Sequence, residues 1–224
     1  MAIDARVHAS HFHLDGVDYF RGHAQAVQFG DVGEKKSAGT QENYLAVQQS
    51  VPRSQLKIQR ATQIDLHGVA LHGSDIGASI TIPGVGSLGP ATLARQLEDQ
   101  ALALVRLETL PQDIVAAAYE SPAVNTELAR AGHAGRLVHQ AFVILEMKTA
   151  LNLTRSIRFD VSGSGLAWAI TGTASGGSRT VVTITPATTF AYLLLKPKWD
   201  ARSLKRGQDS ADWEDDPWSR NDAA

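Results

Sequence analysis

The spacing of apolar residues changes twice along the chain and divides it into three parts. Up to residue 83, apolar and polar positions alternate, loosely at first and more clearly across residues 55–71, which is typical of strands joined by short turns. Between residues 90 and 152, apolar residues recur every three or four positions, which indicates helices. From Ile157 the alternation returns, and it predicts about four antiparallel strands up to Leu195.

Prolines mark where the helices of the middle part should begin. Pro90, Pro111 and Pro122 each stand at the start of a stretch with helical spacing. Proline is favoured at the first helical position because the amide that it lacks would have no intrahelical partner there. A fourth helix is predicted from Gly135 to Leu151, where apolar residues again lie three or four positions apart.

These patterns predict an α+β fold. An antiparallel sheet or open barrel is expected to form from both the N- and C-terminal β segments, with a central helical block (about 90–152) covering one face. Neither β segment could be stable alone, because a short sheet needs a covered face. We therefore expect one domain over residues 1–198, with β structure in 1–83 and 155–197, followed by a flexible acidic tail over 199–224.

Composition narrows the class of protein. The chain has 224 residues, of which 43% are hydrophobic and 20% charged, as in globular proteins. Its net charge of −2 shows no basic excess, so no nucleic-acid partner is expected. The lack of cysteine excludes disulfides, thiolate catalysis and cysteine-ligated zinc. The first residues lack the features of a signal peptide, and no apolar run approaches the ~18 residues of a membrane span, so a cytoplasmic location is expected.

Three of the four tryptophans lie in the last 26 residues, two of them bracketing the acidic run DSADWEDDPW. Indole rings are normally buried, yet this segment has no periodicity and could not fold alone. We therefore expect the tail to dock on a protein partner or on another copy of the chain. The leading hypothesis is a non-catalytic assembly component, with a homo-oligomer expected. The predicted docking residues are Trp199, Trp213, Glu214, Asp215, Asp216 and Trp218.

Histidines near the start of the chain offer a metal site as an alternative. On a strand, His11, His13 and Asp15 would project to one face, and His23 follows soon after. Two imidazoles and a carboxylate suit zinc or iron(II). The His-x-His pair resembles that of cupin-like barrels, which would imply a metal-dependent enzyme, although the glutamate expected shortly downstream is missing. The simpler interpretation is half-exposed strand histidines with no cofactor.

Two further features have functional alternatives. Gly84, Gly86 and Gly89 form a G-x-G-x-x-G sequence between a predicted strand and a predicted helix, an arrangement that can bind anions. Pro90 removes an amide where a phosphate would need one, so a glycine-rich connection is the favoured interpretation. The strands predicted within residues 157–195 also leave open a membrane-active protein that inserts amphipathic hairpins.

Overall fold

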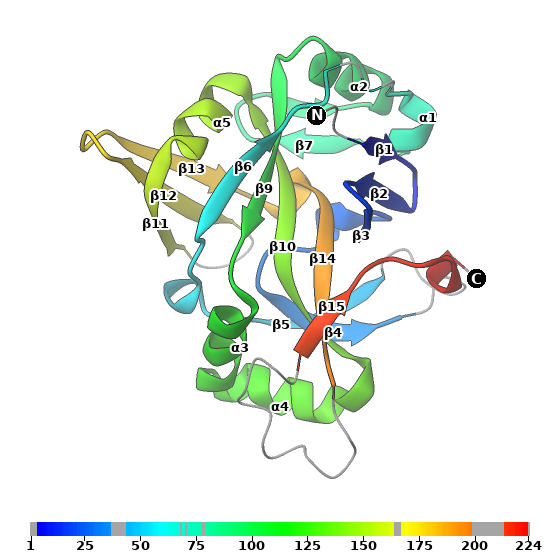
Figure 1. Ribbon diagram of the computed structural model, residues 1–224, viewed down its shortest axis with the longest axis vertical. Coiled ribbons are helices and arrows are strands. Elements are labelled where there is room, and N and C mark those ends of the chain that lie inside the picture. The colour runs from blue at the N-terminus through cyan, green and yellow to red at the C-terminus, as the bar shows by residue number, and fades with distance from the viewer. Residues whose placement is uncertain are drawn as a thin grey trace.

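The centre of the molecule is an antiparallel pair of long strands, β10 (Gly135–Glu146) and β14 (Thr189–Pro197). The computed structural model describes residues 4–36, 44–67, 69, 71–77, 79–163, 167–198 and 213–223. The two strands run through the middle of the fold (Figure 1). Nearly every residue in them is buried, because both faces of the pair are covered.

A single antiparallel sheet forks around this central pair, with different strands flanking its two ends. At one end, three N-terminal strands lie beside β14, and two strands lie beside β10. These are β1 (Ala5–Val7), β2 (His11–Leu14) and β3 (Val17–Phe20), with β9 (Leu102–Glu108) and β6 (Arg60–Ile64). At the other end, β15 lies beside β14, and β4 is followed by β5 beside β10. Their bounds are Trp213–Asp216 for β15, Asp31–Lys35 for β4 and Leu45–Ser50 for β5.

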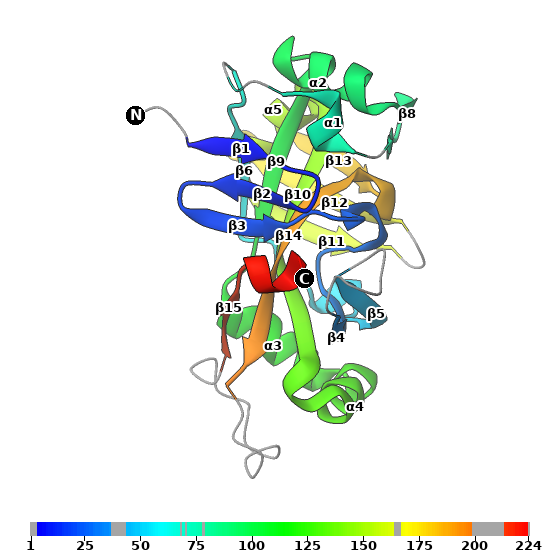
Figure 2. The ribbon, with the colours of Figure 1, turned by 90° about the vertical axis from the view of Figure 1, so that its right-hand side faces the viewer.

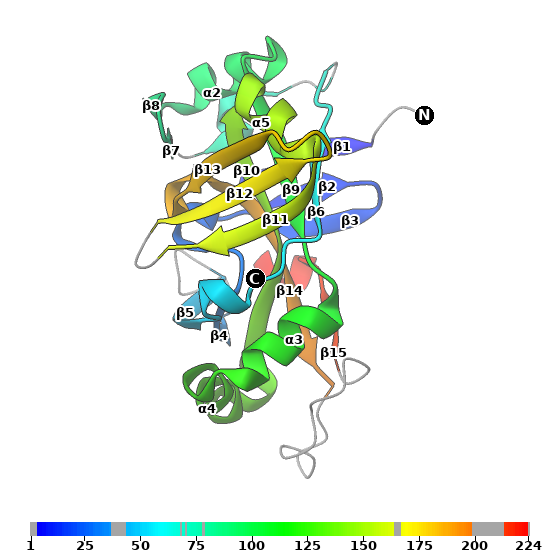
Figure 3. The same ribbon diagram turned by 90° about the vertical axis from the view of Figure 1, so that its left-hand side faces the viewer.

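A second, three-stranded sheet covers one face of the fork (Figure 3). It consists of β11 (Ser156–Ser162), β12 (Trp168–Ala174) and β13 (Arg179–Ile184). Trp168 and Ile170 from this sheet share a buried cluster with Val105 of β9 and Ala141 of β10. The opposite face of β9 and β10 is covered by the N-terminal strands, where the Phe12 ring meets Phe142 and Phe190 edge-on.

The helices and a small hairpin cap the two ends of the fork (Figures 1 and 2). At one end lie α1 (Gly73–Ile76), α2 (Pro90–Glu98) and α5 (Met147–Thr154), with the hairpin of β7 (Ile80–Ile82) and β8 (Gly86–Leu88). At the other end lie α3 (Pro111–Glu120) and α4 (Pro122–Ala131). None of the helices in the described part of the chain is both long and apolar enough to cross a bilayer.

The predicted α+β fold is confirmed, with N- and C-terminal strands in one antiparallel sheet that does not close into a barrel. The three helices predicted to begin at Pro90, Pro111 and Pro122 begin there. The continuous helical block over 90–152 is wrong, because β9 and β10 are strands. Both strands are buried on two faces and therefore read as apolar runs without alternation, which periodicity cannot distinguish from a buried helix.

The predicted C-terminal meander is divided between the two sheets. β11, β12 and β13 pair in order, as expected, but β14 leaves them and becomes a central strand of the forked sheet. A hairpin that inserts residues 157–195 into a membrane would have to extract β14 from that position. The fold thus gives no support to the membrane-active alternative.

We predict that an alanine at Gly33 destabilises the fold, whereas one at Gly176 does not. A Cβ atom at Gly33 would lie 1.9 Å from the backbone oxygen of Ala46 on β5, while one at Gly176 would meet no atom of the described residues within 4 Å. Gly33→Ala should lower the free energy of unfolding by about 1–3 kcal/mol, as overpacking does. Denaturant unfolding of both variants measures this, and equal stability of the two would contradict the β4–β5 geometry.

Candidate functional site

A β-bulge in β10 marks the point where the sheet forks. β10 pairs with β4 up to Leu137 and with β9 from Gln140 onward. Opposite β14, Val138 faces Leu194 and Gln140 faces Leu193, so His139 is the extra residue of the bulge. Bulges re-aim side chains and are frequent beside functional sites. The His139 side chain is only 2% exposed, and its Nε2 lies 3.1 Å from Oδ1 of Asp215 on β15, without hydrogen-bond geometry.

A cavity of about 450 Å³ opens beside this bulge. Four segments that are distant in the sequence line it: β6, the β9–α3 junction, the bulge of β10, and β15. The lining residues are Gln59, Arg60, Glu108, Thr109, Leu110, Pro111, His139, Gln140 and Asp215. Arg60, Glu108 and Gln140 stand directly opposite one another on β6, β9 and β10. We call this cavity the fork pocket.

Four buried polar atoms of the fork pocket have no hydrogen-bond partner among the described residues. They are Thr109 Oγ1, the two ring nitrogens of His139 and Gln140 Oε1. Buried polar groups normally have partners, because leaving one unsatisfied costs about 1–3 kcal/mol. Each of these residues lines the cavity, so a molecule held there could satisfy them.

Charges of both signs meet on this part of the sheet. Glu108 Oε1 lies 2.6 Å from Arg106 Nε. Tyr19 packs edge-on against Phe142, and the charges of both Arg106 and Glu108 act on its pKa. Burial raises the pKa of Tyr19, and Arg106 counteracts part of that rise by its charge and a hydrogen bond. Of the charged side chains that line the fork pocket, Glu108 and Asp215 are acidic and Arg60 is basic, and the charge of Glu108 is compensated by Arg106.

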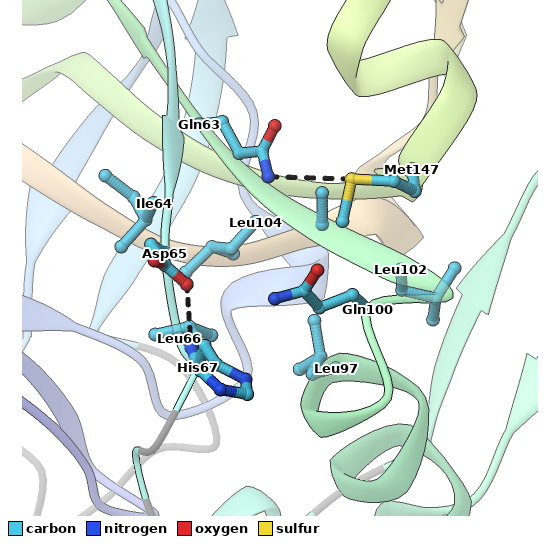
Figure 4. Close-up of a pocket in the computed structure, with 11 residues that line it drawn as sticks. Gln63, Ile64, Asp65, Leu66, His67, Leu97, Gln100, Leu102, Leu104 and Met147 are labelled. Carbon is cyan, nitrogen blue, oxygen red and sulfur yellow. Dashed lines mark hydrogen bonds between the residues drawn. The ribbon is translucent and has the colours of Figure 1, made fainter.

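A second cavity, between β6, α2 and β9, is too small for a ligand (Figure 4). Its volume is about 20 Å³, which suits a single water molecule. The His67 amide donates to Asp65 Oδ1 at 2.8 Å, and Gln63 Nε2 donates to Met147 Sδ at 3.5 Å.

The tryptophans of the C-terminal segment, which we define as residues 213–223, are buried in their own chain. Trp213 is 5% and Trp218 8% exposed. Trp213 belongs to the large buried cluster that extends from the three-stranded sheet to α3 and α4. Trp218 stacks on His11 with ring centroids 3.9 Å apart, and its amide donates to the Asp18 carbonyl at 2.8 Å.

The prediction of a flexible tail is therefore wrong for residues 213–223. The reason is that the body of the chain itself provides apolar surface for both rings, and β15 adds to the edge of β14 through four residue pairs. Of the predicted docking residues, Glu214 and Asp215 keep exposed side chains, whereas Asp216 is buried. Trp199 and the rest of 199–212 lie outside the described residues.

Ion pairs join the C-terminal segment to the rest of the chain. Asp216 Oδ2 accepts from Arg136 Nε at 2.6 Å and from Lys35 Nζ at 3.0 Å, and Lys35 also lies 2.9 Å from Asp222. Burial by itself would raise the pKa of Asp216, but the hydrogen bonds and charges of Arg136 and Lys35 outweigh it and hold that pKa below its usual value. Glu214 also has a lowered pKa, through a hydrogen bond from Lys196.

The histidine candidates for a metal site are not brought together. His11 and His13 do share one face of β2, as predicted, between the buried Phe12 and Leu14. His11 is stacked between His8 and Trp218, and burial and His8 lower its pKa. His13 lies 2.7 Å from Asp18 and 3.4 Å from Asp4.

Asp15 and His23 lie elsewhere. Asp15 forms the β2–β3 turn with φ of 49°, and His23 lines a separate cavity beside Arg21. Within the described ranges, no group of three or more histidine and acidic residues could hold a metal ion. The geometry therefore does not favour the metal-dependent alternative.

The glycines of the candidate anion loop are explained by a hairpin. Gly84, in the turn between β7 and β8, and Gly86, the first residue of β8, adopt φ of 85° and 102°, a backbone conformation that favours glycine. Gly89 is the residue before α2. The sequence is thus a strand–turn–strand element, in contrast to the strand–helix connection of an anion-binding loop.

Comparison with known proteins gives no match to a family model, to a curated protein or to a solved structure. The candidate sites therefore rest on the geometry described above. The pocket residues His139, Gln140, Glu108 and Thr109 were missed in the sequence. Their only signal there is a His-Gln pair interrupting the apolar run of β10.

We predict that Asp216→Asn weakens the fold much more than Glu214→Gln. Asp216 compensates two partly buried cations, so its loss should lower the free energy of unfolding by about 2 kcal/mol at pH 7. Glu214 is exposed, and its loss should cost less than about 0.5 kcal/mol. Denaturant unfolding followed by tryptophan fluorescence measures both.

The effect of Asp216→Asn should depend on pH. A carboxyl group whose pKa is lowered by folding stabilises the fold above its unfolded pKa of about 3.9. That contribution is lost as the pH falls through the lower folded value. The stability difference between the wild-type chain and Asp216→Asn should therefore shrink between pH 5 and pH 3, and a pH-independent difference would argue against the ion pairs as its cause.

Proposed function

We propose that this protein works by assembly with copies of itself, and that the C-terminal segment is the element that docks. The observation that supports the proposal is that residues 213–223 form a complete docking unit. They combine a paired strand, two buried indole rings and two buried carboxylates held by cations of the body. Peptides that add a strand to a sheet edge use the same combination of backbone pairing and side-chain pockets.

The burial of the rings in their own chain favours a copy of this chain over an unrelated partner. The surface that fits Trp213 and Trp218 is already part of every copy. Docking on a different protein would first require both rings to leave that surface. Exchange between copies instead replaces each contact with an identical one, so it costs little apart from the entropy of association.

The length of the connection permits such an exchange. Fourteen residues separate Lys198 from Trp213. A chain of that length spans about 50 Å at most, so the segment can dock on the β14 edge of a copy that lies within that distance. When the segment leaves, β14 presents Leu194 to Pro197 as an open edge, and such edges pair readily with another chain. Mass action then favours the exchanged form as the protein concentration rises.

We expect a cysteine pair across β14 and β15 to report the exchange. Lys196 and Glu214 stand opposite each other and are partly exposed, and the natural chain has no cysteine to interfere. Directly opposed residues in antiparallel strands lie close enough for a disulfide. After incubation at high concentration in mild denaturant, followed by dilution and oxidation, Lys196→Cys/Glu214→Cys should yield covalent dimers on non-reducing gels.

A matched pair within the three-stranded sheet is the control. Ser162 and Ala169 are also opposite each other, but on neighbouring strands of one short connection. Ser162→Cys/Ala169→Cys should give only intrachain disulfides under the same conditions. If the β14–β15 pair also gives only intrachain disulfides at every concentration, self-assembly by exchange is refuted.

The expected cytoplasmic location stays a prediction.

A further inference from the structure

We infer that the fork pocket binds a neutral, hydroxyl-rich ligand of the size of a mono- or disaccharide. His139 is the first observation that points to a ligand. Its ring is almost fully buried, it lines the cavity, and its Nδ1 has no partner among the described residues. Thr109 and Gln140 contribute one more such atom each. An apolar residue in place of any of these would spare the fold an unsatisfied polar group.

The size of the pocket fits a small organic molecule. Its volume of about 450 Å³ lies within the range of about 300–1,000 Å³ that is usual for small-molecule sites. One water molecule would leave most of this space unfilled. The pocket is also built on rigid elements, since three of its walls come from paired strands.

The chemistry of the lining selects the class of ligand. A bound anion would be repelled by the carboxylates of Glu108 and Asp215, and a bound cation would be repelled by the guanidinium of Arg60. A neutral hydroxyl group can donate to the carboxylates and to His139, and can accept from Arg60. Leu110 and Pro111 supply an apolar side, against which the C–H face of a sugar ring would pack.

The pocket is complete only when the C-terminal segment is docked, because β15 supplies Asp215. A bound ligand should therefore stabilise the docked state, whichever copy provides the segment. The inference does not depend on the exchange between copies, since Asp215 lines the pocket in the single chain as well.

The test uses the full-length chain and a panel of glucose, galactose, N-acetylglucosamine, maltose and lactose. Saturation-transfer NMR and thermal unfolding should show that at least one sugar binds with a Kd below about 10 mM and raises Tm. Thr109→Val and His139→Phe should each weaken that binding by about tenfold or more, as the loss of a hydrogen bond does.

Stability measurements distinguish a ligand role from a structural one. Because Thr109 Oγ1 and His139 Nδ1 have no hydrogen-bond partner in the described part of the chain, both variants should fold with an unchanged or higher Tm in the absence of sugar. Thr173→Val, on β12 and away from the pocket, is the matched control and should bind as the wild-type chain does. The inference is overturned if no sugar of the panel binds, or if neither pocket variant weakens binding.

Discussion

The pairing of β10 with β14 is the interaction on which the remaining structure depends. The two strands exchange contacts from Leu137 opposite Leu195 to Val143 opposite Thr189, and both are buried on both faces. The other strands of the forked sheet pair with one of these two strands directly or through one or two intervening strands. β10 is longer than any of its partners, so β4 and β9 share its outer edge and leave an interval between them. That interval is the bulge at His139.

The fork explains why the candidate sites are neighbours. On the β10 side, the interval between β4 and β9 leaves polar groups that no strand partner covers, and these line the fork pocket. On the β14 side, β3 pairs at Tyr192 only, so the edge from Leu194 to Pro197 is free for β15. Open edges invite association, and this chain covers one of them with its own C-terminal segment. The buried rings of Trp213 and Trp218 hold this segment against the sheet edge.

Apolar contacts and ion pairs both hold the C-terminal segment against the rest of the chain. The indole rings of Trp213 and Trp218 remove apolar surface from water, which is the larger favourable contribution but has little directionality. The pairs that Asp216 makes with Arg136 and Lys35 add directional contacts, at 2.6 and 3.0 Å, between β15 and the rest of the chain. Lys35 is itself held by the Phe20 ring, 4.9 Å away. Release of the segment would break all of these contacts together.

The sequence by itself determined the α+β class, the strands at both ends, and the helices that begin at Pro90, Pro111 and Pro122. It did so because backbone constraints at proline and the alternation of half-buried strands are local properties. It also placed His11 and His13 on one face of a strand. Only the tertiary structure decided the rest. β9 and β10 resemble helices in sequence because burial on two faces removes the alternation that identifies strands. The rings of Trp213 and Trp218 were expected to meet another molecule because the residues that bury them come from several elements far away in the sequence. Trp213 joins a large cluster that includes residues of α3 and α4, and Trp218 joins one that includes residues of β3 and β5. The site around His139 also depends on the tertiary structure, because Glu108, Thr109 and Asp215 line the same pocket only in the folded, forked sheet.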